Sequence, residues 1–273
     1  MLQQGMIERF REAFRADERV VSALMFGSFA IGEGDAYSDV EFAVFVADEH
    51  FDGFDPAAWL DAVSPVAAYF PDDHGHHTAL FHNGVRGEFH FLRASQQSVV
   101  EGWKGHGWFR ALSDAVMLDR TGELSRHARA LVGGPPERGG AELVRGLSLN
   151  LINHTLMGAQ LLRRGEWARA WAVLPRAHEN LLKLVRLQHG ATDHWPTPSR
   201  AFERDLPAPV VDRYVRCTAA ASPRELPSAY RATWSWAREL FAAVAAPLGV
   251  EVPASTLGHV DALLAEAAEA EGA

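Results

Sequence analysis

The residues with the clearest chemical potential are two carboxylates, Asp39 and Glu41, which open an apolar run. Side chains two apart on a β-strand share a face, so these acids are expected side by side. Neighbouring anions repel each other at low dielectric unless a cation lies between them. A partly open site of oxygen ligands favours Mg²⁺ held jointly with substrate phosphates, and such a site is predicted here. The alternative is a turn with exposed acids on an edge strand.

A glycine-punctuated turn precedes these acids and begins at Gly27-Ser28. Glycine lets the backbone approach a phosphate closely, while exposed N–H groups and a hydroxyl can bind its oxygens. Gly27, Ser28 and Ser38 are therefore predicted to bind the phosphate-bearing substrate. Tyr37, in the same turn, is a candidate contact for a second substrate.

A third carboxylate, Glu88, lies in the middle of a predicted strand on which Phe89 and Phe91 face the opposite side. Desolvation among aromatic rings is expected to raise the pKa of Glu88 and to suit it to proton abstraction. Glu88 could also complete the metal shell. The alternative is an ion pair with Arg86 or Arg93.

A second candidate pair, Glu179 and Lys183, lies one helical turn apart in the second half of the chain. Lysine is scarce, because Lys104 and Lys183 are the only two in the sequence. The ammonium of Lys183 could neutralise a triphosphate, and Glu179 is a rival to Glu88 as the base. An ordinary surface pair is the alternative.

His76, His77 and Trp108 are candidate contacts for the second substrate. A zinc site is the other interpretation of the histidines, but their spacing fits no standard zinc motif. Tryptophans such as Trp108 are more commonly part of a core.

The first half of the chain alternates helix and strand patterns, which predicts an N-terminal domain over residues 1–134 with a mixed β-sheet and flanking helices. The expected segments are a helix over Gln4–Ala16 and strands over Val20–Phe26, Val40–Val46, Val66–Phe70, Thr78–Phe81 and Gly87–Leu92. The overall class is α+β.

The density of Gly and Pro over residues 133–140 predicts a linker. Beyond it, residues 141–273 are expected to form an α-helical bundle, because apolar residues recur at spacings of three and four. The predicted helices are Ala141–Arg164, Trp167–His189, Pro207–Ala220, Glu225–Ala246 and Ser255–Ala270.

Composition narrows the classes of protein. A chain of 273 residues suits two modest domains, and a net charge of −9 argues against nucleic-acid binding. The longest apolar stretch, Leu240–Val250, contains Pro247 and is too short for a membrane span. Cys217 is the only cysteine, so no intrachain disulfide can form. A cytoplasmic enzyme is expected.

The Gly27-Ser28 turn followed by Asp39-x-Glu41 resembles the signature of the polymerase-β nucleotidyltransferase superfamily. That resemblance implies nucleotide binding at Gly27, Ser28, Ser38 and Lys183, with Mg²⁺ on the carboxylates. The superfamily more often has Asp at the position of Glu41, which leaves the metal chemistry intact.

Longer stretches, Ala23–Val46, Ser64–Phe91 and Gly165–Arg200, resemble the lincosamide nucleotidyltransferases. They include Arg-Gly-Glu-Phe-His-Phe at 86–91 and Arg-Gly-Glu-x-Ala-Arg at 164–169. The resemblance implies transfer of AMP from ATP to a sugar hydroxyl of lincomycin or clindamycin, release of pyrophosphate and antibiotic resistance. It also implies a homodimer whose helical domains help to form the sites.

Within the lincosamide family the strand glutamate matching Glu88 is the base. Kanamycin-type enzymes instead use a helical Glu and Lys spaced like Glu179 and Lys183, and an aminoglycoside or another hydroxylated small molecule is the alternative acceptor. The expected partners are therefore a nucleoside triphosphate and a small antibiotic, without nucleic acid or membrane.

Overall fold

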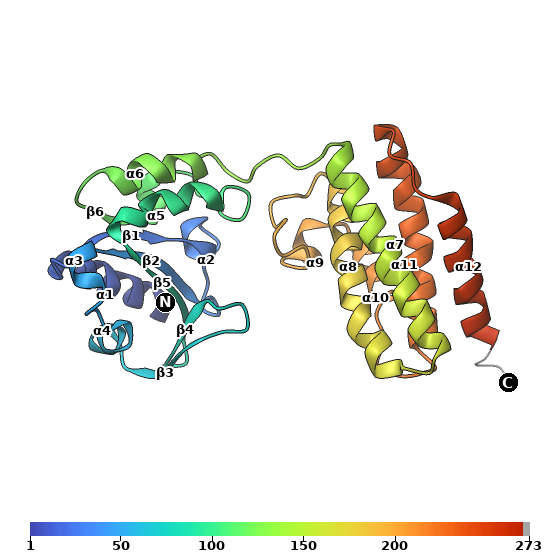
Figure 1. Ribbon diagram of the computed structural model, residues 1–273, viewed down its shortest axis with the longest axis horizontal. Coiled ribbons are helices and arrows are strands. Elements are labelled where there is room, and N and C mark those ends of the chain that lie inside the picture. The colour runs from blue at the N-terminus through green and yellow to red at the C-terminus, as the bar shows by residue number, and fades with distance from the viewer. Residues whose placement is uncertain (270–273) are drawn as a thin grey trace. The chain divides into compact units, whose positions relative to one another are not determined.

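The computed structural model describes residues 1–269 (Figure 1). The chain divides into two compact units, Met1–Pro136 and Glu137–Ala273, and each has its own hydrophobic core. The division falls inside the Gly- and Pro-rich segment 133–140. The expected α+β class is confirmed, because the first unit holds a six-stranded sheet with helices and the second is helical.

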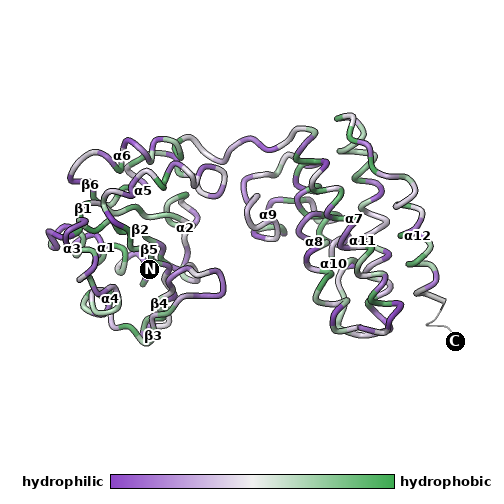
Figure 2. Tube along the Cα trace, in the orientation of Figure 1, coloured by the Kyte–Doolittle hydropathy of each residue, from purple (hydrophilic) through white to green (hydrophobic). Residues whose placement is uncertain are grey.

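The sheet of the first unit is mixed, with the strand order β3-β4-β5-β2-β1-β6. The central strands β2 and β5 run parallel, and the other neighbours are antiparallel. The strands are β1 (Val20–Met25), β2 (Val40–Val46), β3 (Val66–Pro71), β4 (His77–Phe81), β5 (Arg86–Arg93) and β6 (Val116–Asp119). Most residues of β1 and β2 are buried hydrophobic residues, and Figure 2 colours the chain by residue hydropathy.

Short helices surround this sheet. They are α1 (Leu2–Ala16), α2 (Gly27–Ala30), α3 (Asp48–Phe51), α4 (Pro56–Val63), α5 (Leu112–Ala115) and α6 (Glu123–Ala128), with 3₁₀ segments η1 (Ala94–Trp103) and η2 (Arg129–Leu131). The Phe10 ring of α1 lies 5.3 Å from that of Phe42 and 5.2 Å from that of Phe89. Because side chains alternate along a strand, α1 covers the face opposite to Glu41 and Glu88.

The second unit is a helical bundle. Its elements are α7 (Ala141–Arg163), α8 (Trp167–His189), α9 (Phe202–Asp205), α10 (Ala208–Val215), α11 (Leu226–Leu240), the π-helical η3 (Phe241–Ala245), the 3₁₀ segment η4 (Ala246–Leu248) and α12 (Ala254–Glu269). Apolar faces of α7, α8, α11 and α12 form its core. None of the helices described is long and apolar enough to cross a membrane.

Two predicted helices end earlier than expected. The helix predicted to reach Ala220 stops at Val215, since tight turns then carry Cys217 into the core. The helix predicted to reach Ala246 stops being regular at Leu240, seven residues before Pro247, whose missing N–H interrupts the α-helical hydrogen bonds. The end of the last predicted helix, Ala270, and the remainder of the expected domain to residue 273 lie outside the described residues.

Candidate active site

The turn after β1 brings Gly27 against the carboxylate of Glu41. The N–H of Phe26 donates to the carbonyl of Glu41 at 3.1 Å, which ties the end of β1 to the start of β2. Gly27 has a φ of +69°, and a Cβ at this position would overlap the Glu41 carboxylate. Glycine is therefore required twice, for its left-handed backbone and for the space that the acid fills.

The hydroxyl of Ser28 is buried next to this turn. Its Oγ finds no hydrogen-bond partner among the described residues. A buried hydroxyl without a partner carries a desolvation cost of about 1–3 kcal/mol, which a bound acceptor oxygen would remove. This orphaned donor fits a phosphate oxygen held at the Gly27-Ser28 turn.

Two of the three predicted carboxylates lie on the two central strands. Glu41 of β2 and Glu88 of β5 are direct partners in the parallel register. Asp39 precedes β2 and, two residues before Glu41, belongs to the same face. Thr78 of β4 is the partner of Glu88 on its other side. The strand pairing thus brings these acids together at one end of the central strands, which local sequence patterns did not specify.

Arg86, two residues before Glu88, supplies positive charge next to these acids. Its guanidinium forms an ion pair with Asp39 and lies 3.8 Å from Glu88 Oε2. A further contact of 3.5 Å reaches Thr78 Oγ1. The alternative predicted for Glu88, a pairing with Arg86, is present, and in this state an arginine provides part of the cationic charge that the acids need.

Two histidines contact Glu88. His90 Nε2 lies 2.9 Å from Glu88 Oε1, and His76 Nδ1 lies 3.5 Å from the same oxygen. The hydrogen bond with His90 lowers the pKa of Glu88; burial opposes that shift, and the charges of His90, His76 and Arg86 add to it. The predicted rise of this pKa is therefore wrong, because imidazoles rather than phenyl rings surround the carboxylate.

The turn that carries Tyr37 and Ser38 is held by Asp35 and Gln3. Asp35 accepts from the backbone N–H of Tyr37 at 2.8 Å and from the hydroxyl of Ser38 at 3.0 Å. The amide of Gln3 donates to the carbonyl of Ala36 at 2.7 Å. The hydroxyl of Ser38 is thus used inside the turn, whereas the Tyr37 side chain is 96% exposed.

The other candidates for the second substrate are dispersed. His77 follows His76 directly but packs against the ring of Tyr69, at 5.2 Å between centroids. Trp108 is half-buried in the loop between η1 and α5. Of these three remaining candidates, the structure brings His76 to Glu88.

In the second unit, Lys183 and Glu179 form the expected pair on α8, with 2.7 Å between Nζ and Oε1. The Lys183 ammonium also lies 5.9 Å from the centre of the Trp195 ring. The Lys183 side chain is largely buried, whereas that of Glu179 is exposed. The pair is therefore only partly an ordinary surface ion pair.

A preformed metal cluster is absent: in the part of the chain that the structure describes, no three His, Cys, Asp or Glu side chains converge as ligands. The residues nonetheless fit a divalent cation whose remaining ligands are phosphate oxygens. Asp39, Glu41 and Glu88 offer oxygen donors on one face, and the Glu41 carboxylate lies directly against the Gly27 turn.

Two different family models match the two units of the chain. The model of the nucleotidyltransferase domain matches residues 7–77, and that of the lincosamide nucleotidyltransferase-like C-terminal domain matches residues 140–263. The first match includes Gly27, Ser28, Asp39 and Glu41 but stops before Glu88. No curated protein matches the sequence at a significant level.

Two solved structures are similar to the chain at low identity. An aminoglycoside 6-adenyltransferase from Bacillus subtilis is 14% identical, with 94% of this chain and 97% of that chain covered and a TM-score of 0.44. A nucleotidyltransferase-like protein from Exiguobacterium sibiricum 255-15 is 16% identical, with 85% and 74% covered and a TM-score of 0.36. The family assignment rests on the two family models.

Proposed function

Because the chain belongs to the lincosamide nucleotidyltransferase-like family of nucleotidyltransferases, we propose that it transfers AMP from ATP to a sugar hydroxyl of a lincosamide. Pyrophosphate is the second product, and the modified antibiotic is inactivated. The proposal rests on the adjacency of Glu41 and Glu88 beside the Gly27-Ser28 turn.

Asp39, Glu41 and Glu88 are the residues that would hold Mg²⁺. When bound, the metal would stabilise the charge of the triphosphate and of the departing pyrophosphate. Gly27 and the orphaned hydroxyl of Ser28 bind phosphate oxygens beside it. Arg86 pairs with Asp39 and would compete with the metal for this carboxylate.

Glu88 accepts the proton in the transfer step. The hydroxyl oxygen of the acceptor forms a new bond to the α-phosphorus as the bond to the pyrophosphate oxygen breaks. The hydroxyl proton passes to the Glu88 carboxylate, whose pKa is lowered chiefly by the hydrogen bond with His90. Glu179 remains the rival base, since it carries a carboxylate beside Lys183.

The proposed partners follow from this chemistry. ATP is the donor and a lincosamide the acceptor, and Tyr37, His76, His77 and Trp108 are proposed contacts of the acceptor. The ATP donor supports a cytoplasmic enzyme. The family resemblance supports a homodimer in which the helical unit takes part, and the second unit is proposed to contribute to acceptor binding.

The proposal is tested with purified full-length protein, MgATP and a panel that contains lincomycin, clindamycin and aminoglycosides. We expect pyrophosphate release with the lincosamides and a product whose mass increases by one AMP unit. Asp39→Asn and Glu41→Gln should abolish both signals, because each removes a proposed metal ligand. Glu49→Gln, an exposed acid on α3, is the matched control and should retain full activity.

Two outcomes bear directly on the proposal. Transfer to aminoglycosides but not to lincosamides would contradict the acceptor and leave the chemistry in place. Absence of transfer to every acceptor, or full activity in Asp39→Asn, would contradict the nucleotidyltransferase mechanism itself.

A further inference from the structure

His90 occupies a specific place relative to Glu88. Both residues lie on β5, two apart, so their side chains share the face that carries the acids. His90 Nε2 is 2.9 Å from Glu88 Oε1, within ordinary hydrogen-bond length. An ionised carboxylate only accepts hydrogen bonds, so the imidazole donates in this contact.

Rings from separate elements fix the His90 imidazole. Phe26, which directly precedes the Gly27 turn, lies 5.4 Å from it between ring centroids. Trp103, at the end of η1, lies 6.1 Å away. The His76 ring stands almost perpendicular to it at 5.3 Å. The imidazole is therefore confined to an orientation in which Nε2 meets Glu88.

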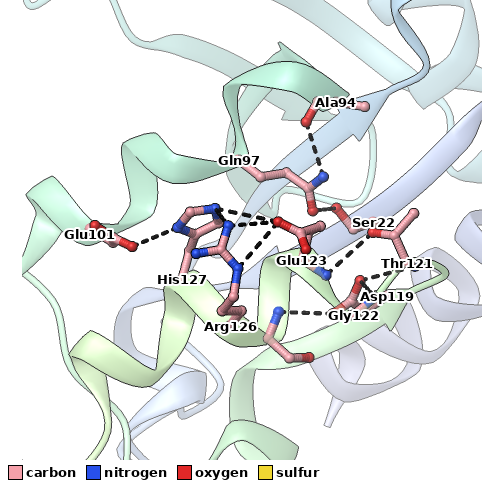
Figure 3. Close-up of polar contacts among 11 residues, drawn as sticks. Ser22, Ala94, Gln97, Glu101, Asp119, Thr121, Gly122, Glu123, Arg126 and His127 are labelled. Carbon is pink, nitrogen blue, oxygen red and sulfur yellow. Dashed lines mark hydrogen bonds and ion pairs between the residues drawn. The ribbon is translucent and has the colours of Figure 1, made fainter.

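The segment that carries Trp103 is itself anchored. The buried hydroxyl of Ser22 in β1 donates a hydrogen bond of 2.9 Å to the side-chain oxygen of Gln97 in η1. The carboxylate of Glu101 lies 2.6 Å from Nδ1 of His127 in α6 (Figure 3). Because both contacts lie on the turns of η1 before Trp103, they hold the indole beside His90. The position of the imidazole thus depends on β1, β5, η1 and α6 together.

The contacts separate the two oxygens of Glu88. Oε1 is the oxygen that meets His90 and His76, whereas Oε2 lies 3.8 Å from Arg86, which pairs with Asp39. One oxygen is thereby committed to the imidazoles, and the other lies on the side of the Arg86 guanidinium.

We propose that His90 is a positioning residue that fixes the Glu88 carboxylate, so that Oε2 serves the transfer reaction while Oε1 is held. This inference rests on the proposed function. In many enzymes a neighbouring residue orients a base or a metal ligand through a hydrogen bond, and His90 would act on Glu88 in this way. His76 makes a longer contact from an exposed turn and is secondary.

The test uses substitutions that separate packing from hydrogen bonding. His90→Phe keeps a ring between Phe26 and Trp103 but removes the donor, whereas His90→Gln offers an amide donor of similar reach. We expect kcat of His90→Phe to fall about 10- to 100-fold, as when other outer-shell partners are lost, with KM for ATP nearly unchanged. His90→Gln should recover most of the loss.

His82→Phe is the matched control, because this exposed histidine lies in the β4–β5 turn and should leave kcat unchanged. If His90→Phe does not fold, His90→Asn replaces it, since the shorter amide cannot reach Glu88. Wild-type kcat in the variant without the donor, or an equal loss in His90→Gln, overturns the inference.

An activity-independent measurement separates this inference from the proposed function. The ¹⁵N NMR signal of His90 Nε2 should shift in Glu88→Gln and stay in place in Glu49→Gln. An unshifted signal would contradict the contact. A wild-type protein that transfers AMP to no acceptor, with the signal shifting as expected, would contradict the proposed function and leave the contact standing.

Discussion

At the scale of single residues, alternation along a strand accounts for most of the candidate site. Asp39 and Glu41 could be placed on one face from their spacing, and Glu88 was recognisable as a polar residue within an apolar run. Their meeting requires β2 to pair in parallel with β5, and that long-range register is not encoded in either segment alone.

The surroundings of Glu88 were predicted less well. Alternation also puts Arg86 and His90 on its face, but the aromatic residues of the motif suggested desolvation as the dominant effect. The structure shows a carboxylate between an imidazole and a guanidinium, so its pKa is lowered, first by the hydrogen bond with His90. Burial raises this pKa as expected, but the hydrogen bond with His90 and the neighbouring charges outweigh it.

The choice between two bases leads to a prediction at this scale. Glu88→Gln should lower kcat by about 10²- to 10⁴-fold, the usual contribution of a positioned base, because the amide cannot accept the proton. Glu179→Gln should retain most of the turnover. Single-turnover kinetics with saturating MgATP checks both variants. Retained turnover in Glu88→Gln together with its loss in Glu179→Gln would move the base to α8.

At the scale of elements, segments with a strong period were predictable and those defined by distant pairing were not. The helices α7 and α8 follow their predicted ranges closely, because a long apolar stripe identifies them. The four-residue strand β6 was not predicted, since it exists through pairing with β1. The short helix α4 was also missed, although Asp55 caps its first turn.

The close approach of α7 and α11 gives a prediction at this scale. A Cβ on Gly158 of α7 would overlap the ring of Tyr230, whose hydroxyl donates to the carbonyl of Ala170 at 2.7 Å. Tyr230 is fully buried and cannot retreat without losing that bond. Gly158→Ala should therefore destabilise the helical unit by about 1–3 kcal/mol, measured as a lower thermal midpoint by circular dichroism.

Gly146 is the matched control on the same helix. It is exposed and a Cβ there meets nothing within 4 Å, so Gly146→Ala should stabilise the helix by about 0.5–1 kcal/mol. An unchanged or raised midpoint in Gly158→Ala would show that α7 and α11 do not pack as closely as described.

At the scale of the whole molecule, each unit has its own core and its own candidate residues. Composition and the Gly- and Pro-rich segment indicated two domains, and the predicted α+β class is confirmed. The acidic site lies within the first unit, while the Glu179–Lys183 pair belongs to the second. The identity of the acceptor was not readable from the catalytic motif, because that motif describes the phosphate chemistry alone.

We propose that Asp39, Glu41 and Glu88 capture a divalent ion beside the phosphates of the nucleotide. Electron paramagnetic resonance with Mn²⁺ and a non-hydrolysable ATP analogue tests it most directly in the full-length protein. We predict one tightly bound Mn²⁺ in the wild type and affinity at least about 10-fold weaker in Asp39→Asn and Glu41→Gln, since each loses a charged ligand. Wild-type Mn²⁺ affinity in both variants would contradict the account.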